Sequence, residues 1–551
     1  MKSILSRIPM LKNLTLMLLL SSSIQAQNVP AGILYPSGST PVFSPSNFTP
    51  GIKVNYVRSI VPSDAVTDEI EIQPTDYSLS KVKTNYLDGL GRVIQTVAHF
   101  ASPQANDIVN VTTYDNLGRD AYHFLPYSKA ESTGNGKFKL TPYSDQVDFY
   151  KNTLGYTADK YFYNQTRYEA SPLNRVVKTL PQGNSWMGND RGTTITENPL
   201  PAGANIRLFT IAYAPGSVPV TSGVYATGDL LVRTTTDEDG NFTEEYTTKD
   251  NRLVLKTTGK TGNAVKLQTY YVYDDFGLLR YVIPPKATVW LAANSWALSG
   301  AVSKELCFNY VYDGRLRMII KNIPGAGTQF LIYNLKDEVI LTQTPTQTSK
   351  GEWMFNKYDV LGRLIQTGVY NSTTSAPTLQ GFANAPYTGT DAFLTYLFKE
   401  IYGNAAYVNT FTNAKVLTTN YYDDYSFTTR TYNAAHMGAL PVGWNMALSQ
   451  ETASLLTGTK TIVLDGATTP TALVTVNFYN DRGLLLQTQA QNHKGGWNTV
   501  TSSYDFTNQK LGTYTELTNP QATNNTTIKT VETYAYDHSG RILATTHTLN
   551  A

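Results

Sequence analysis

The sequence Tyr114-Asp115-Asn116-Leu117-Gly118-Arg119 is one copy of a six-residue phrase that recurs along this chain of 551 residues. Two further copies are complete: Tyr358-Asp359-Val360-Leu361-Gly362-Arg363 and Tyr536-Asp537-His538-Ser539-Gly540-Arg541. Three are close variants: Asp88-Gly89-Leu90-Gly91-Arg92 behind Tyr86, Tyr273-Asp274-Asp275-Phe276-Gly277-Leu278, and Tyr479-Asn480-Asp481-Arg482-Gly483-Leu484. A phrase repeated from end to end predicts a repeat architecture, which is typical of scaffolds rather than of active sites.

Each phrase lies between two stretches that read as β-strands. Val109, Val111 and Thr113 alternate with polar residues before the first phrase, and Val93-Ile94-Gln95-Thr96 follows Arg92. An Asp at the first corner of a turn accepts from the N–H two residues on, and the Gly adopts the left-handed conformation of a type I turn with a bulge. The phrase therefore predicts a hairpin whose Tyr and Arg flank the turn, and we expect ring and guanidinium to stack on the sheet.

Degenerate copies extend the pattern between the complete ones. Turn formers remain in Tyr312-Asp313-Gly314-Arg315-Leu316-Arg317, which has lost its Gly, and at Tyr333-Asn334, Tyr422-Asp423 and Tyr504-Asp505. Thr236-Asp237-Glu238-Asp239-Gly240-Asn241 keeps only the turn. The spacing is shorter and less even than the roughly 40–45 residues of a propeller blade. We therefore predict an all-β fold, a long antiparallel hairpin meander that curls into a partial shell.

Composition narrows the classes of function. The chain is 41% hydrophobic, so it can bury a large core, and its 38 Tyr residues favour strands. Only 16% of residues are charged and the net charge is +2, which excludes a surface built for nucleic acid. Cys307 is the only cysteine, so no internal disulfide can form.

The N-terminus reads as a secretory signal peptide over residues 1–26. Lys2, Arg7 and Lys12 precede the apolar run 14–20, and small residues lead to an expected cleavage after Ala26. The run is too short to span a bilayer, and no later segment is apolar enough to do so. The expected location is outside the cell or on its surface.

The remaining chain divides by composition into three parts. Residues 27–50 are rich in Pro and predict an extended leader, residues 51–225 an N-terminal β domain with the first repeats, and residues 226–551 the repeat sheet. Helical insertions are expected near 287–299 and 390–401, where apolar residues recur at helical spacing. Residues 128–160, 181–222 and 370–390 are rich in turn formers and predict long loops.

The repeated Tyr-Asp-x-x-Gly-Arg phrase resembles the YD repeat of the RHS family of bacterial proteins, over about residues 86–541. The stretch from Asn55 to Gln95 also resembles the N-terminal domain of such proteins in Bacteroidetes-type bacteria. The resemblance implies a hollow β-sheet shell around a C-terminal effector, often a toxin, which a core region releases by self-proteolysis. No core motif or effector follows Arg541 before Ala551, so we expect either a partial shell or a fragment of a longer product, with no self-cleaving residues in this sequence.

No constellation of residues predicts an enzyme. The six His residues lack metal-ligand spacing, and no nucleophile elbow, phosphate loop or dinucleotide fingerprint is present. Cys307 lies in an apolar context typical of a buried thiol. The acidic run Asp237–Asp239 could hold calcium, but a hairpin turn explains it better. We predict no catalytic, cofactor or metal residues.

Two functions follow as hypotheses. The first is a secreted non-enzymatic scaffold, part of a shell that encloses or presents an effector in interbacterial competition or at the cell surface, the effector being C-terminal or separately encoded. The second is an adhesin that binds cell-surface glycans through exposed Tyr and Trp rings. Rings stacked on neighbouring strands favour the first, and rings that face solvent in a groove favour the second.

Overall fold

The computed structural model describes residues 43–62, 80–129, 136–214, 216–464, 466, 471–537 and 540–549. The predicted signal peptide and residues 27–42 of the predicted leader lie outside them.

Strands dominate the chain from the first described segment to the last. In the N-terminal third they are β1 (Asn55–Pro62), β2 (Ser80–Leu87), β3 (Val93–Ala98), β4 (Asp107–Tyr114), β5 (Asp120–Phe124), β6 (Tyr127–Lys129), β7 (Tyr163–Tyr168), β8 (Val176–Leu180), β9 (Thr193–Pro199), β10 (Arg207–Thr210) and β11 (Val220–Val224). The middle strands are β12 (Leu230–Thr236), β13 (Asn241–Thr248), β14 (Leu253–Lys260), β15 (Lys266–Tyr273), β16 (Leu279–Ile283), β17 (Phe308–Tyr312), β18 (Met318–Ile323), β19 (Gly327–Tyr333) and β20 (Val339–Gln343). The last are β21 (Glu352–Tyr358), β22 (Leu364–Asn371), β23 (Ala414–Tyr422), β24 (Leu456–Ile462), β25 (Ala472–Tyr479), β26 (Leu485–Gln491), β27 (Trp497–Tyr504), β28 (Lys510–Thr518), β29 (Thr527–Tyr536) and β30 (Ile542–Leu549).

Short helices interrupt the strands. They are α2 (Pro142–Asp148), the π-helix η2 (Phe149–Thr153), the 3₁₀ turn η3 (Met187–Asn189), α3 (Pro285–Ala293), α4 (Gly300–Leu306), α5 (Pro345–Lys350), α6 (Ala376–Ala383), α7 (Ala392–Phe398), and the 3₁₀ turns η4 (Asn404–Ala406) and η5 (Ala434–Ala439).

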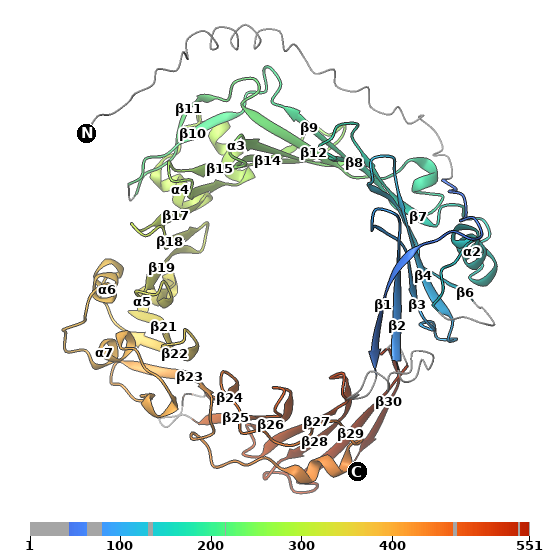
Figure 1. Ribbon diagram of the computed structural model, residues 1–551. Helices are drawn as coiled ribbons and strands as arrows, with labels where there is room; N and C mark the ends of the chain where they lie inside the picture. Colours follow the sequence, from blue (N-terminus) through green and yellow to red (C-terminus); the bar gives the residue numbers. More distant parts are fainter. Residues whose placement is uncertain are drawn as a thin grey trace, which may run out of the picture.

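One antiparallel sheet of 28 strands runs through the molecule, and β10 and β11 form a separate hairpin. Each strand pairs mainly with its neighbours in sequence, with a jump from β9 to β12 across the β10–β11 insertion. The sheet curls into a ring (Figure 1). Among the described residues β1 pairs only with β2 and β30 only with β29, so strand pairing does not close the ring. The prediction of an all-β meander that curls into a partial shell is confirmed.

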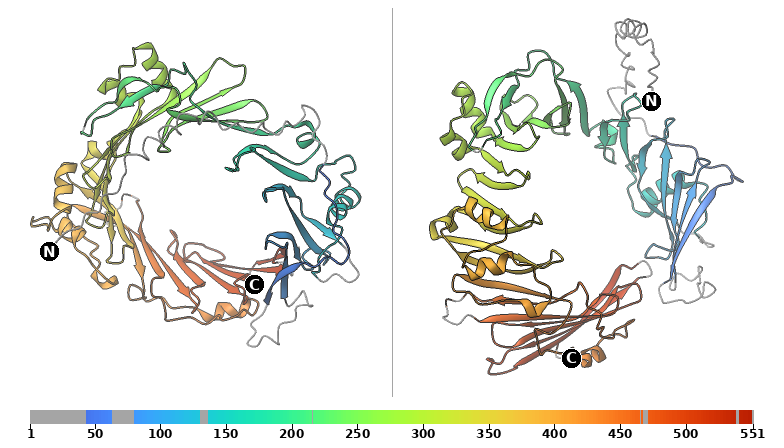
Figure 2. Two further views of the ribbon diagram at one scale, coloured as in Figure 1. Left: turned by 45° about the horizontal axis from the view of Figure 1, so that its top comes forward. Right: turned by 60° about the vertical axis from the view of Figure 1, so that its left-hand side comes forward.

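The apolar cores lie between the sheet and the insertions that cover its outer face (Figures 1 and 2). In β21 the burial alternates, and Trp353 and Phe355 pack with Phe393 and Leu397 of α7. A second core joins Leu255 and Ile283 of the sheet to Leu291 of α3. This one-sided burial stabilises the ring because a curled sheet must cover one face with apolar contacts.

The insertions differ in part from expectation. The helix expected near 287–299 is α3, and a second helix that was not expected, α4, begins directly after this range at Gly300. The helix expected near 390–401 is α7, whose first turn is capped by Asp391. Segments 128–160 and 370–390, predicted as loops, contain α2 and α6. Each helix has a Pro in its first turn, Pro142 in α2 and Pro377 in α6. Pro is common both in loops and at the first turn of helices, so these residues did not distinguish the two. The segment 181–222 holds β9, β10 and part of β11.

Candidate functional site

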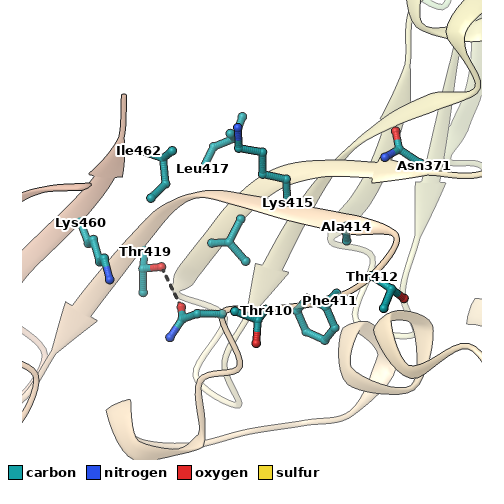
Figure 3. A pocket seen from close by; sticks show the side chains of 12 residues that line it. Asn371, Thr410, Phe411, Thr412, Ala414, Lys415, Leu417, Thr419, Lys460 and Ile462 are labelled. Carbon is teal, nitrogen blue, oxygen red and sulfur yellow. Dashed lines mark hydrogen bonds between the residues drawn. The ribbon is translucent and has the colours of Figure 1, made fainter. Parts of the chain in front are cut away.

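An open groove of ≈ 560 Å³ lies beside β22, β23 and β24 (Figure 3). Amide, hydroxyl and apolar groups line it together with Lys415 and Lys460, and Thr419 donates a 3.5 Å hydrogen bond to Asn409. Its lining contains no carboxylate, imidazole or thiol, so it offers neither a nucleophile with a base nor a set of metal ligands.

Cys307 and Lys357 are chemically reactive residue types, but both side chains are buried and have structural roles. Cys307 is fully buried, and burial raises the pKa of its thiol to about 12, which removes it as a nucleophile. Lys357 is buried beneath α7, where its Nζ donates to the carbonyls of Leu397 (3.0 Å) and Lys399 at the C-terminus of that helix. Burial lowers the pKa of Lys357 to about 8. Its role is a helix cap. Sequence reasoning missed Lys357, whose signal was a cation at an inward position of an alternating strand.

The repeated phrase builds one turn geometry. In the turn after β4, Asp115 Oδ1 accepts from the N–H groups of Leu117 and Arg119, each at 2.9 Å, and Oδ2 accepts from Arg119 Nε at 2.7 Å. Gly118 has a φ of +78°, and the register shifts by one residue before Tyr114, as in a bulged type I turn. The same bonds recur at Asp88 with Arg92 and at Asp359 with Arg363, and Asp537 likewise binds Arg541.

Hydrogen bonds within the turn hold the pKa of Asp88 below its usual value, the N–H of Arg92 contributing most. For Asp115 burial acts in the opposite direction, and the bonds from Arg119 outweigh it. These carboxylates are therefore negative at neutral pH and are occupied by their own turns rather than free for catalysis.

Successive repeats are joined through the Tyr and Arg of the phrase. The guanidinium of Arg92 lies 4.2 Å from the ring centre of Tyr114 in the next repeat, and Tyr114 Oη donates to the carbonyl of Val93 at 3.0 Å. Arg363 repeats this arrangement on Tyr422, 4.5 Å away, whose Oη bonds to Leu364. The expected stacking of ring and guanidinium occurs, but Arg92, Arg119, Arg317 and Arg363 stack on the Tyr of the following repeat rather than on their own.

The hydroxyl bond recurs even where the Arg is missing. Tyr312, Tyr479, Tyr504 and Tyr536 each donate to a carbonyl at the start of a strand in the preceding hairpin, at 2.7 to 3.0 Å. We call this series of contacts the Tyr–Arg ladder. It places these repeat rings against neighbouring strands, the arrangement expected of a structural role.

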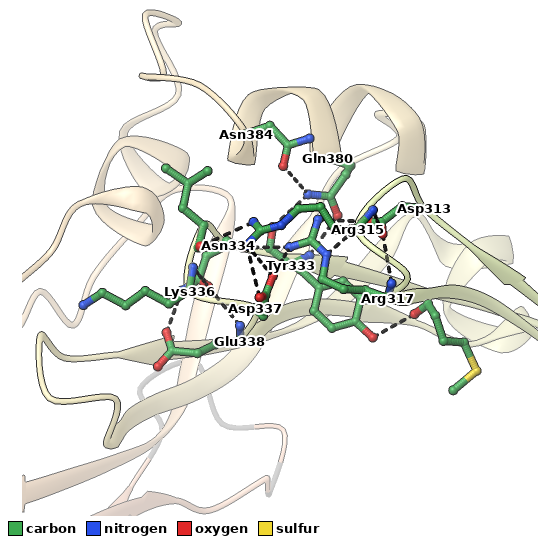
Figure 4. A network of polar contacts seen from close by, with 12 residues as sticks. Asp313, Arg315, Arg317, Tyr333, Asn334, Lys336, Asp337, Glu338, Gln380 and Asn384 are labelled. Carbon is green, nitrogen blue, oxygen red and sulfur yellow. Dashed lines mark hydrogen bonds and ion pairs between the residues drawn. The ribbon is translucent and has the colours of Figure 1, made fainter. Parts of the chain in front are cut away.

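Figure 4 shows the ladder at its most polar point, between β17–β18 and β19–β20. Arg317 binds Asp313 of its own turn and donates to the carbonyl of Asn334 (3.0 Å) and to Asp337 (2.9 Å) of the next. Arg315 reaches the same Asp337 at 3.1 Å. Leu316 occupies the Gly position with a φ of +64°, so the degenerate copy keeps the whole turn despite the lost Gly.

Two copies of the phrase lack the Arg, and they differ in whether the first turn position is Asn or Asp. Asn480 is fully buried, its Oδ1 accepts from the N–H groups of Arg482 and Leu484, and no Arg follows the Gly. In the Tyr273 copy, which also lacks that Arg, Asp274 pairs instead with buried Arg280 at 3.3 Å. A buried carboxylate thus has a cation beside it, while an amide needs none.

One predicted turn lies on the opposite rim of the sheet. Strands alternate in direction, so the turns after β2, β4, β7, β13, β15, β17, β19, β21, β25, β27 and β29 share one rim, which we call the repeat rim. The turn at Asp237–Asn241 follows β12 and therefore lies on the other rim. It is a hairpin, as expected, but the turn in repeat register is Thr248–Arg252, where Thr248 replaces the Asp. A Thr in place of the acid hid it from sequence reasoning.

The insertions are bound to the sheet through a glutamine that the sequence reasoning missed. Gln487 accepts from the backbone N–H of Asn433 (3.0 Å) and donates to its carbonyl (3.1 Å), as a neighbouring strand would. Gln95 makes the same pair of bonds with Lys139. Gln366 receives Tyr396 Oη at 2.7 Å. The signal was the Gln-Thr pair that follows the phrase, interpreted only as a strand.

The two ends of the sheet meet at a contact that we call the seam, where Lys81 Nζ of β2 lies 3.0 Å from where a Cβ on Gly540 would stand. Arg541, in the last repeat turn, donates through Nη2 to the carbonyl of Ala101 at 2.8 Å, across 440 positions of sequence. Figure 1 places the last strands of the sheet near the ends of β1 and β2. Elsewhere the Arg of a repeat turn reaches the next repeat, so the last Arg here meets the first hairpins instead.

Within the part of the chain that the structure describes, no cluster of three or more His, Cys, Asp or Glu residues could hold a metal ion. No helix of the described residues is long and apolar enough to cross a membrane.

Comparisons with known proteins give a domain match and fold likenesses. Residues 58–198 match a family model described as a domain of unknown function, DUF6443. No curated protein matches the chain. Among solved structures, crystal structures of TcdB2-TccC3-TEV and of TcdB2-TccC3-Cdc42 are similar at 12% identity, with TM-scores of 0.42 and 0.40. The matches cover 97% and 85% of this chain but only 23% and 21% of those chains, so the chain spans less than a quarter of their length.

Proposed function

We propose that this chain is a secreted, non-enzymatic scaffold, a segment of an RHS-type shell that encloses or presents an effector. The observation that carries the proposal is the single sheet curled into a ring with its helices on the outer side (Figure 1), where α3 and α7 pack on the two largest apolar cores. The repeated Asp, Tyr and Arg side chains bond within the turns and the Tyr–Arg ladder. They therefore stabilise the sheet itself.

The inward face around β9 to β14 supports containment because it carries charged side chains of both signs. Leu230 and Val232 of β12 enter the outer core, so Leu231 and Arg233 point to the other face of the sheet. On that face Lys256 lies 3.6 Å from Glu245, and Arg233 lies 3.8 Å from Glu197. Such a surface tolerates a hydrated polypeptide without binding it tightly.

A protease-protection experiment tests containment. A short unstructured peptide with a protease site is appended after Ala551, and the same peptide is placed before Gln27 in a matched fusion. Enclosure predicts slower cleavage of the C-terminal peptide than of the N-terminal one. Equal rates in the folded fusions would contradict containment.

A glycan array separates the proposal from the adhesin hypothesis. The scaffold predicts no saturable binding, because the ladder tyrosines use their hydroxyls on backbone carbonyls. Tight sugar binding that is lost in Trp or Tyr variants outside the ladder would favour the adhesin.

A further inference from the structure

Among the described residues, β30 is an edge strand that carries none of the usual protection against further pairing. All eight of its residues are exposed, and the side chains of Ile542, Leu543 and Leu549 are 59%, 67% and 61% exposed. The strand contains no Lys, Arg, Asp, Glu or Pro, whereas natural edge strands use charged residues and Pro to prevent pairing. The edge strand β1 does contain such residues, Arg58 and Pro62. Of these two edges, β30 is therefore the one suited to pairing.

The Tyr–Arg ladder has an unfilled position beside β30. Where the ladder is complete, the Arg lies over the next Tyr ring, and that Tyr donates to the carbonyl of the residue after the Arg. Arg317, for example, lies 4.8 Å from the ring centre of Tyr333, whose Oη donates to the carbonyl of Met318 at 2.8 Å. In the last turn these two places belong to Arg541 and Ile542. Within the described part of the chain, no ring lies over Arg541 and no side-chain hydroxyl donates to the carbonyl of Ile542.

The exposure of Arg541 agrees with a missing ring. The four ladder Arg side chains that lie over a ring are 8% to 34% exposed, whereas the side chain of Arg541 is 45% exposed. Its hydrogen bond to the carbonyl of Ala101 is compatible with a ring at this position. Arg119 shows this, because it donates to the carbonyl of Glu169 while it lies over Tyr168.

Strand direction determines which strand fits this position. β30 begins at the repeat rim, so a strand that continues the antiparallel meander must end there. The strands of this sheet that run to that rim and end in Tyr include β4, β7, β15, β17, β19, β21, β25, β27 and β29. A second copy of this chain fits less well. Its β1 would run parallel to β30, unlike the described strand pairs, and its β30 would bring Leu549 rather than a Tyr to the rim.

From these observations we propose that β30 binds one antiparallel β-strand of a partner polypeptide, a strand that ends in Tyr at the repeat rim. The Tyr ring lies on the guanidinium of Arg541 and its hydroxyl donates to the carbonyl of Ile542, which completes the ladder. Backbone hydrogen bonds along β30 supply the affinity, and the Tyr sets the register of the added strand. The inference concerns this edge alone and does not depend on containment.

A peptide titration tests the proposal. The probe is a fluorescein-labelled peptide with the sequence of β4, Asp107–Tyr114, amidated at its C-terminus, and fluorescence anisotropy follows its binding to the chain from Gln27 onward. Saturable binding with a Kd of about 10–100 μM is expected. The peptide with Tyr114→Ala should bind at least tenfold more weakly. The peptide with Tyr114→Phe keeps the ring but loses the hydroxyl bond, and should bind about threefold more weakly.

Protein variants locate the site. Arg541→Ala should weaken binding of the Tyr114 peptide about threefold to tenfold and leave binding of the Ala peptide unchanged. General loosening of the seam would weaken both peptides alike, so this coupling separates the two explanations. Arg58→Ala, on the edge strand β1, is the matched control and should leave binding unchanged. Saturation with the peptide should slow hydrogen exchange of the β30 amides and not of the β1 amides.

Four results of these measurements would overturn the inference. They are the absence of saturable binding up to about 1 mM peptide, equal binding of the Tyr and Ala peptides, equal weakening by Arg58→Ala and Arg541→Ala, and protection of β1 instead of β30. Sedimentation velocity is the parallel measurement. A dimer of the chain that excess peptide does not dissociate would assign the edge to a second copy and would also overturn the inference. None of these results changes the outcome of the protease-protection experiment, so containment is tested separately.

Discussion

At the scale of single residues, the left-handed backbone position of each turn determines which amino acids can occupy it without strain. Gly118 and Gly362 have a φ of +78°, while Leu316 holds the same position at +64°. A side chain with a Cβ in that region costs on the order of 1–2 kcal/mol. The glycines of the phrase are thus there for backbone conformation.

Replacing Gly118 or Gly362 by Val should lower the free energy of unfolding by about 1–3 kcal/mol, because a β-branched residue resists the left-handed conformation. At Gly118 the new Cβ would also meet Arg92 Nη1 at 2.8 Å. Denaturant unfolding measures the effect. Gly89→Ala is the control, since Gly89 has no positive φ and no atom within 4 Å of the new Cβ. Equal stability of all three variants would contradict the turn geometry.

The converse change should stabilise the protein. Leu316→Gly relieves the left-handed strain and is expected to raise the free energy of unfolding by up to about 1 kcal/mol, less the entropy that a Gly adds to the unfolded chain. A thermal melt of this variant beside wild type checks it. A marked loss of stability would show that the Leu316 side chain, rather than its backbone, matters.

The turn carboxylates predict the response to acid. The pKa values of Asp88, Asp115 and Asp313 lie below their usual range, and a depressed folded pKa means stability that is present above the unfolded pKa of about 3.9. That stability is lost as pH falls through the lower folded values, so unfolding should steepen below about pH 4. Asp115→Asn should flatten the dependence, as the native Asn480 turn illustrates. A pH-independent midpoint between pH 5 and 2 would contradict the prediction.

At the scale of elements, ion pairs and glutamines decide how hairpins and insertions are joined. Arg363 binds Asp423 through both nitrogens at 2.7 Å and Asp359 through Nε, and the bonds to Asp423 contribute most to raising its pKa. Arg363→Lys should therefore destabilise by about 1–3 kcal/mol, because an ammonium cannot make the forked contact or stack equally on Tyr422. Urea unfolding measures the change, and Arg233→Lys, at an exposed pair, is the neutral control.

The glutamine contacts predict local opening. Gln487→Leu leaves the backbone N–H and carbonyl of Asn433 without their partner and should release the segment around η5. Limited proteolysis should then cut within residues 424–455 before the sheet unfolds. Cleavage that starts instead in the repeat turns would contradict this role for Gln487.

The sequence predicts features that depend on contacts between residues close together in the chain, and it does not predict contacts between distant residues. The phrase fixes its own turn, because Asp115 binds atoms no more than four residues away, so hairpins and fold class were accessible. The partner of each Arg could not be predicted, because Arg363 binds Asp423 across 60 positions of sequence. The sequence pattern counted the turn at Asp237 among the repeat copies because a local motif does not reveal strand direction. Gln487 was missed because its partner Asn433 lies 54 positions away.

At the scale of the whole molecule, a meander of this kind has two unpaired edges, and here the turn before β30 meets the segment after β3. All eight residues of β30 are exposed, and β1 is exposed along most of its length. Curvature accumulated over 28 strands, rather than any sequence signal, brings Arg541 to Ala101.

The seam should be the weakest link of the ring. Arg541→Ala removes the hydrogen bond to the carbonyl of Ala101 and should widen the distribution of distances between spin labels placed on β2 and β30, with little change in the melting temperature. Arg92→Ala, inside the ladder, should lower the melting temperature and leave the distance distribution between the labels unchanged. An unchanged distance distribution in Arg541→Ala would show that other contacts hold the ends together.

The most direct test of the account is electron microscopy of single particles of the chain from Gln27 onward. A wall built by the Tyr–Arg ladder predicts a hollow ring, one sheet thick, with its helices on the outside and one seam. A filled globule, or two separate compact lobes joined by a linker, would contradict it.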